Sequence, residues 1–108
     1  MDWTAFFVWG TGTKKRETVH YLYILYSSKL DRYYKGQTGH VEKRVVKHNR
    51  GHSLATRAGV PWELVKMIEF ENKRDAIRAE NWLKKMKSRS VIEQVIEGEI
   101  DLKKIIVG

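Results

Sequence analysis

The feature that most constrains the fold is an almost uninterrupted apolar run at residues 19–26, which reads VHYLYILY. This run is short and rich in aromatic and branched side chains, which is typical of a strand covered on both faces. Only residues 27–31 separate it from a second strand-like segment, RYYKGQT, at residues 32–38. A connection that short joins antiparallel neighbours, so the two segments predict a β-hairpin.

The next part of the chain predicts one helix and a third strand. Val41 and Val45 lie one turn apart and give a helix over residues 41–49 an inner face. Polar and apolar residues then alternate over residues 62–70, as in a half-buried strand. On strict alternation, one face of this strand carries Trp62, Leu64, Ile68 and Phe70.

Two further helices are predicted after the third strand. Asn72 is a suitable N-cap for a long helix over residues 73–87. Ser90 and Glu93 have the spacing of a capping box that opens a short last helix. The fold class is therefore α/β (α+β), with a three-stranded antiparallel sheet flanked by helices.

The pattern places this domain at residues 20–97. Residues 1–19 form an N-terminal extension, disordered or accessory, whose aromatic cluster at residues 3–9 offers a contact for a protein partner. Residues 98–108 form a C-terminal tail with room for one further short element.

Charge and cysteine content narrow the classes of function. The 108 residues include 21 lysines and arginines against 13 acidic residues, which gives a net charge of +8. Such an excess on a small domain favours a polyanionic partner, with nucleic acid as the first candidate. Because the chain has no cysteine, disulfides, zinc–thiolate sites and thiol catalysis are excluded. No apolar run approaches the roughly 20 residues of a membrane span, so we expect no membrane partner and a cytoplasmic protein.

Five polar side chains occupy positions where they can meet: Tyr23, Tyr34, Arg44, His48 and Glu80. This set suits metal-assisted phosphodiester hydrolysis, in which a cation stabilises charge on the phosphate and a tyrosine or histidine takes a proton from water. One carboxylate can hold magnesium when waters and phosphate supply the other ligands. Spacing alone also fits a purely structural role for these residues. The tyrosines would then be present because they favour strands, and Glu80 and Lys84 would form an ion pair on a helix surface.

The order of these residues resembles the GIY-YIG nuclease family. The resemblance runs over roughly residues 20–97, through YLYIL, RYYKGQTGHVEKRVVKHNRG and PWELVKMIEFENKRDAIRAENWLKK. It looks closest to the small stand-alone bacterial members, and more distantly similar to the N-terminal domain of excinuclease C. The resemblance implies the GIY-YIG fold, whose three-stranded antiparallel sheet agrees with the elements above.

The resemblance also implies a role for each candidate. The two signatures place Tyr23 and Tyr34 as the active-site tyrosines, which position and deprotonate water. Arg44 would stabilise the transition-state phosphate, with His48 assisting one turn later. Glu80 matches the carboxylate that binds the divalent metal, Mg²⁺ or Mn²⁺.

Three positions depart from the family pattern. Tyr21 stands where the first signature has glycine, and small members often carry an aromatic residue there. Gln37 stands where some members have lysine, which removes a positive charge near the phosphate. Lys35 is a poor substitute, because in a regular strand its side chain points to the face opposite Tyr34.

We therefore expect a metal-dependent DNA endonuclease, in repair or recombination, although the pattern does not separate DNA from RNA. The side chains expected to touch nucleic acid are Lys35, Gln37, Lys43, Lys47, Arg50, Arg57, Lys84, Lys85 and Lys87, with Arg32 and Arg89 on the same basic face. One alternative is a catalytically weak nucleic-acid-binding module. The other is an interaction subunit of a repair complex, held through the N-terminal aromatic residues.

Overall fold

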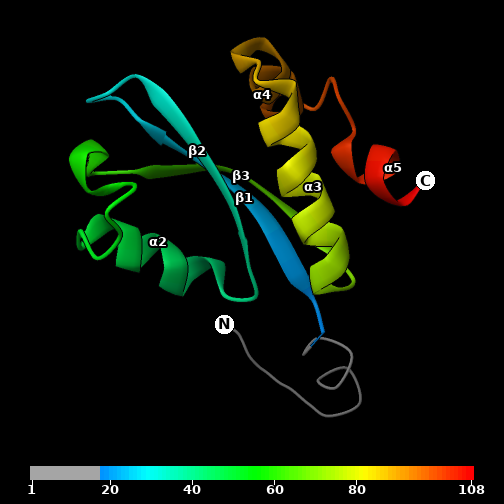
Figure 1. Ribbon diagram of the computed structural model, residues 1–108, viewed down its shortest axis with the longest axis horizontal. Coiled ribbons are helices and arrows are strands. Elements are labelled where there is room, and N and C mark those ends of the chain that lie inside the picture. The colour runs from blue at the N-terminus through cyan, green and yellow to red at the C-terminus, as the bar shows by residue number, and fades with distance from the viewer. Residues whose placement is uncertain (1–17) are drawn as a thin grey trace.

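The computed structural model describes residues 18–108, in which three strands form one antiparallel sheet in the order β2–β1–β3 (Figure 1). β1 spans His20–Ser27, β2 spans Arg32–Thr38 and β3 spans Glu63–Phe70. The apolar run predicted as a strand covered on both faces is thus the central strand, which confirms the fold class. The predicted N-terminal extension lies almost entirely outside the described residues, so its role and its proposed partner stay predictions.

Helices cover both faces of the sheet. The elements outside it are α2 (Val41–Asn49), the 3₁₀ turn η1 (Arg57–Gly59), α3 (Lys73–Met86), α4 (Arg89–Ile96) and α5 (Leu102–Val107). In Figure 1, α2 lies on one side of the strands, whereas α3, α4 and α5 gather on the other. None of the helices within residues 18–108 is long and apolar enough to cross a membrane.

The alternation of side chains along β1 divides the core into two clusters. Leu22 and Ile24 pack in the larger cluster, which includes Phe70 and the buried faces of α3, α4 and α5. Tyr23 and Leu25 point the other way, into a smaller cluster with Val41 of α2 and Trp62. Successive residues of a strand face opposite sides, so a single central strand supplies both clusters. The tyrosine therefore belongs to the α2 face of the sheet.

A β-bulge corrects the predicted faces of β3. Leu25 pairs with Leu64 and Ile24 pairs with Lys66, which leaves Val65 as an extra residue. An extra residue reverses the alternation beyond it. Leu64 is consequently on the α2 side with Leu25, and Trp62 packs in the same cluster as Tyr23. The prediction that Trp62 and Leu64 share a face with Ile68 and Phe70 was wrong for this reason.

The helix caps agree with the sequence at one position and correct it at another. The Asn72 side chain accepts a hydrogen bond from the Asp75 amide at 2.8 Å, as an N-cap should. The predicted cap at Ser90 is wrong, because Ser88 caps α4 by accepting from the Val91 amide. Glu93 instead accepts hydrogen bonds from the side chains of Tyr33 and Arg89.

The C-terminal residues pack as part of the domain. Leu102 and Ile106 of α5 are buried in the larger cluster, and α5 contacts α3. Residues 98–108 thus contribute the further short element that the sequence allowed, and the packing of the domain continues past residue 97.

Candidate active site

Strand register places the two signature tyrosines on one face of the sheet. Tyr23 of β1 pairs with Gly36 of β2, and Leu25 pairs with Tyr34. The two tyrosine rings lie with their centroids 6.4 Å apart. Lys35 pairs with Ile24, on the face opposite the tyrosines, which confirms the orientation expected from the strand period. The same register puts Gln37 opposite Leu22, also away from Tyr34.

Gly36 makes room for the Tyr23 ring. A Cβ atom built on Gly36 would lie 2.6 Å from the Tyr23 hydroxyl oxygen and 2.7 Å from Cζ. Both distances are shorter than van der Waals contact, so any side chain here displaces the ring. The glycine of the second signature is thus explained by the close approach of a side chain from the neighbouring strand.

Gly36→Ala is expected to destabilise the fold by about 1–3 kcal/mol, the usual cost of overpacking a filled site. The ring of Tyr23 is buried and hydrogen-bonded, so it has no free space to move into. Chemical denaturation measures the loss. Gly39→Ala is the matched control, because its Cβ would meet only the edge of His20 at 3.3 Å. An equal or smaller loss for Gly36→Ala would show that the ring is loosely held.

A buried chain of three side chains runs inward from Tyr23. The Tyr23 hydroxyl lies 3.0 Å from Nε2 of His48, and Nδ1 of His48 lies 2.7 Å from the Thr56 hydroxyl. Tyr23, His48 and Thr56 are 1%, 3% and 1% exposed. His48 is thus the buried residue of α2 that joins the sheet to the loop after the helix, rather than a solvated edge residue.

Trp62 contacts the Thr56 end of this chain of hydrogen-bonded side chains. Its indole N–H donates to the Thr56 carbonyl at 2.7 Å, and its ring lies edge-on to Tyr34 with the centroids 6.2 Å apart. The Asn49 side chain holds the Trp62 backbone at two points, accepting from the amide at 2.6 Å and donating to the carbonyl at 3.0 Å. The bulge in β3 turns Trp62 to this face of the sheet. The bulge thereby also determines which residues surround His48.

The environment sets the protonation states of Tyr23 and His48. Burial and the neighbouring Tyr34 raise the pKa of Tyr23 to about 12, against an opposing effect of Arg44. Burial, followed by the charges of Arg44 and Lys47, lowers the pKa of His48. At neutral pH the tyrosine is therefore protonated and the imidazole is neutral. A neutral imidazole has one nitrogen that accepts a proton, so the pair can transfer one.

A cationic cleft opens beside these rings. It has a volume of about 300 Å³ and is lined by Tyr34, Arg44, Lys47, His48, His52 and Ser53. A second hollow of about 410 Å³ continues along α2, between Glu42, Lys43, Val46, Lys47, Arg50 and His52. Lys47 and His52 line both, so the two hollows form one basic groove along α2.

Glu80 approaches the tyrosines from α3. Its side chain is 15% exposed, and its Oε2 accepts from Nζ of Lys84 at 2.7 Å. The carboxylate lies close enough to Tyr23 to contribute to its raised pKa. Within residues 18–108 no three His, Asp or Glu side chains gather as a metal site. The donor set is thus one nearly buried carboxylate, which fits a magnesium ion that keeps water and phosphate oxygens as its other ligands.

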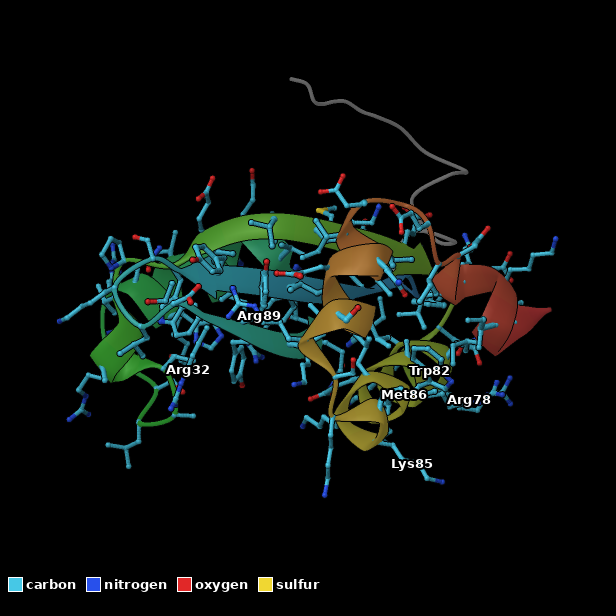
Figure 2. All side chains as sticks on the ribbon, turned by 90° about the horizontal axis from the view of Figure 1, so that it is seen from above. Arg32, Arg78, Trp82, Lys85, Met86 and Arg89 are labelled. Atoms are coloured by element: carbon cyan, nitrogen blue, oxygen red, sulfur yellow. The ribbon has the colours of Figure 1, made fainter. Side chains whose placement is uncertain are left out.

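The basic side chains predicted to touch nucleic acid fall into separate groups. The cleft and its continuation hold Lys43, Lys47 and Arg50, all exposed. Arg57 is exposed in the loop that follows, where its Nε donates to the Gly51 carbonyl at 3.2 Å. Lys85 lies on α3 beside Arg78, Trp82 and Met86, well apart from Arg32 and Arg89 (Figure 2).

Three of the other predicted contacts have different surroundings. Lys84 is paired with Glu80, whose hydrogen bond raises the pKa of Lys84. Lys87 is exposed at the left-handed C-cap of α3. Arg89 is held by Asp31 at 2.8 Å and by Glu93 at 3.2 Å, with its guanidinium 5.1 Å from the centre of the Tyr33 ring. Arg89 therefore ties the β1–β2 turn to α4, and its role as a phosphate contact stays a prediction.

Thr56 and Trp62 are site residues that the sequence did not assign. Both lie in or just after an irregular loop, where no hydrophobic period fixes the direction of a side chain. The nearest signal is that Thr56 is a small hydroxyl residue between Ala55 and Arg57, and that Trp62 follows Pro61 directly. Neither feature reveals a partner on α2.

Known proteins share this arrangement of motifs. A family model described as the GIY-YIG catalytic domain matches residues 19–92. A UPF0213 protein of Clostridium perfringens is 37% identical over 94 residues, covering 78% of this chain and 100% of the relative. A UPF0213 protein of Bacillus licheniformis is 40% identical over 79 residues, covering 72% of this chain and 79% of the relative.

Among solved structures, the chain is similar to a UPF0213 protein from Bacillus halodurans determined by solution NMR. The two are 35% identical, with a TM-score of 0.47, and the match covers 73% of this chain and 83% of the other.

Proposed function

This chain belongs to the GIY-YIG family and to its UPF0213 group, and from that premise we propose that it is a divalent-metal-dependent endonuclease acting on DNA. The observation that carries the proposal is the buried Tyr23–His48 hydrogen bond, whose histidine lines a cationic cleft. Buried tyrosines are common in proteins. A buried histidine that is hydrogen-bonded to such a tyrosine, and that lies beside cations, suits proton transfer at a phosphate. Repair or recombination is the expected setting.

Tyr23 and His48 supply the proton path. As water attacks phosphorus, its proton moves to the Tyr23 hydroxyl oxygen while the tyrosine's own proton moves to Nε2 of His48. The path suits the two pKa shifts, because a tyrosine with a pKa of about 12 is a poor phenolate but a good relay. The imidazolium that forms keeps its hydrogen bond to Thr56, 2.7 Å from Nδ1.

Arg44 and Glu80 are the charged residues of the proposed mechanism, one for the phosphate and one for the metal. Arg44 lines the cleft, where its guanidinium can bind two phosphate oxygens at once. Tyr34 lines the same cleft and positions the phosphate or the water. Glu80 would hold a magnesium ion, which when bound polarises the phosphate and lowers the pKa of bound water. The carboxylate has two oxygens, so it can serve the metal while Oε2 stays with Lys84.

A second candidate function is a binding module that does not turn over. The Lys84–Glu80 pair favours it, because a carboxylate neutralised at 2.7 Å attracts a cation less strongly. On that alternative the groove along α2 binds nucleic acid and the tyrosines only shape it.

A cleavage panel separates the two functions. Intact duplex, nicked, branched and single-stranded DNA, with an RNA of matched sequence, are incubated with Mg²⁺, Mn²⁺ or EDTA. We expect nicking or cutting of DNA with either metal and none in EDTA. Tight binding without cleavage on every substrate would favour the binding module instead.

Binding to duplex DNA is expected to weaken steeply with salt. If about 4–6 phosphates are neutralised, the logarithm of the association constant falls against log salt with a slope near −4 to −5. The exposed cations along the α2 groove supply most of these contacts. Fluorescence anisotropy in EDTA over a range of sodium chloride gives the slope, and constant affinity between low and physiological salt would remove nucleic acid as the partner.

Thr56→Val is expected to slow cleavage at least about tenfold, which is less than the roughly 100- to 10,000-fold lost with a proton-transfer group itself, because Thr56 only supports His48. The change leaves Nδ1 of His48 buried without its partner, which destabilises the fold by about 1–3 kcal/mol. It also lowers the proton affinity of the imidazole, so the acid limb of the pH–rate profile moves to lower pH.

Thr56→Ser is the matched control for this variant. It keeps the hydroxyl, so both the rate and the acid limb should return towards wild type. Because the pKa of His48 is already below its usual 6.5, the wild-type limb itself lies below pH 6.5. A stability loss in Thr56→Val with an unmoved pH profile would assign Thr56 a structural role alone.

A further inference from the structure

The loop between α2 and η1 carries one apolar side chain that packing does not explain. Leu54 is 82% exposed, far more than any other exposed large hydrophobic residue between Thr18 and Gly108. Single exposed leucines are common on protein surfaces. Leu54 is notable for its position, because its neighbour Ser53 lines the cleft that also includes Tyr34 and Arg44.

The tip of this loop is held in place by backbone hydrogen bonds. The Ser53 carbonyl accepts from the amides of Thr56 at 3.2 Å and Arg57 at 3.0 Å, so Leu54 lies in a closed turn. The Arg57 side chain bonds to the Gly51 carbonyl on the other side of the loop. Two residues after Leu54, the Thr56 side chain is fixed against His48. The leucine therefore projects from a fixed support beside the proposed chemistry.

Basic residues flank the leucine on both sides in the sequence, so a phosphate backbone bound by them would pass close to it. Lys47 and His52 line the groove before it, and Arg57 follows it. An apolar side chain next to phosphate-binding cations matches the wedges that proteins insert between base steps. A side chain on a fixed turn loses little conformational entropy when it inserts between two bases. Insertion is therefore favoured over a contact along the outside of an intact base stack.

We infer that Leu54 is a wedge that enters an opened base step, so that the preferred substrate is DNA already interrupted at the cleavage position, such as a nick or a branch. The inference rests on the proposed function for the substrate class. Intact duplex is disfavoured because each insertion must first unstack a base step, which costs free energy. At a nick or branch that cost is largely removed.

The test measures binding and base unstacking in EDTA, so that it does not depend on cleavage. A DNA duplex carries 2-aminopurine beside a nick, and the same duplex without the nick serves as reference. We expect wild type to bind the nicked duplex on the order of tenfold more tightly and to raise 2-aminopurine fluorescence there. Leu54→Ser should lose most of both effects, whereas Leu54→Met should keep them.

Val107→Ser is the matched control, since Val107 is also exposed, at 57%, but lies on α5. Leu54 touches no core cluster, so circular dichroism should show all variants folded. Equal affinity of wild type for both duplexes, or an unchanged preference in Leu54→Ser, would overturn the wedge even if metal-dependent cleavage is found. A lost preference in Leu54→Ser supports the wedge even if no substrate is cleaved, an outcome that would reject only the proposed nuclease activity.

Discussion

Glu80→Gln is expected to reduce DNA cleavage to background, even at high magnesium. Glutamine keeps the shape and helix propensity of glutamate but removes the charge that would hold the metal. Within residues 18–108 no group of three or more His, Asp or Glu side chains could hold a metal ion, so we expect no replacement for Glu80 from this part of the chain. DNA binding in EDTA should stay equal or improve, because one negative charge has left a basic surface.

Lys84→Gln is the control for this experiment. It breaks the same 2.7 Å ion pair while leaving the carboxylate in place. A helix ion pair of this i, i+4 spacing contributes at most about 0.5 kcal/mol to stability, so neither variant should unfold. Cleavage by Lys84→Gln should persist, since its carboxylate is free for the metal. Metal-dependent turnover close to wild type in Glu80→Gln would reject the mechanism proposed here.

Tyr23→Phe is expected to lower turnover at least about 100-fold, the scale of lost proton-transfer catalysis. The change removes only the hydroxyl that bonds to His48, so the ring still fills its place over Gly36. His48 then has a buried nitrogen without a partner, which costs about 1–3 kcal/mol of stability. Single-turnover rates at saturating protein separate this chemical effect from weaker DNA binding.

Tyr34→Phe is the comparison that assigns the roles. Tyr34 lines the cleft and meets the His48 ring edge-on, with centroids 5.1 Å apart, but its hydroxyl is not part of the Tyr23–His48–Thr56 chain. We therefore expect the smaller loss from Tyr34→Phe. A larger loss there would make Tyr34 the proton acceptor, and full activity of both variants would make the signatures structural.

The strands and helices could be predicted because their side chains repeat with a regular period. The hairpin, α2 and the opposed faces of Tyr34 and Lys35 follow from that period alone. The direction of Trp62 could not be predicted, because the bulge at Val65 is set by how β3 pairs with β1. Alternation within one strand contains no information about an extra residue that only the partner strand defines.

The chemistry of the candidate site was only partly visible in the sequence. Tyr23, His48 and Glu80 are named by the family pattern, but the burial of His48 depends on Thr56, which lies in an aperiodic loop. Arg89 has a partner that the sequence pattern does not reveal. Its positive charge suggests a phosphate contact, whereas Asp31, distant in sequence, takes up the guanidinium.

The division of the core into two layers separates the groups that the proposed mechanism needs. Tyr23 and His48 belong to the layer that contains α2, whereas Glu80 is delivered by α3, which packs with the opposite layer. Neither layer carries the full set of groups. On the proposed mechanism, a chain whose α3 has not docked lacks the carboxylate that would hold the metal, so we expect it not to cleave DNA. Cleavage would then require the complete fold.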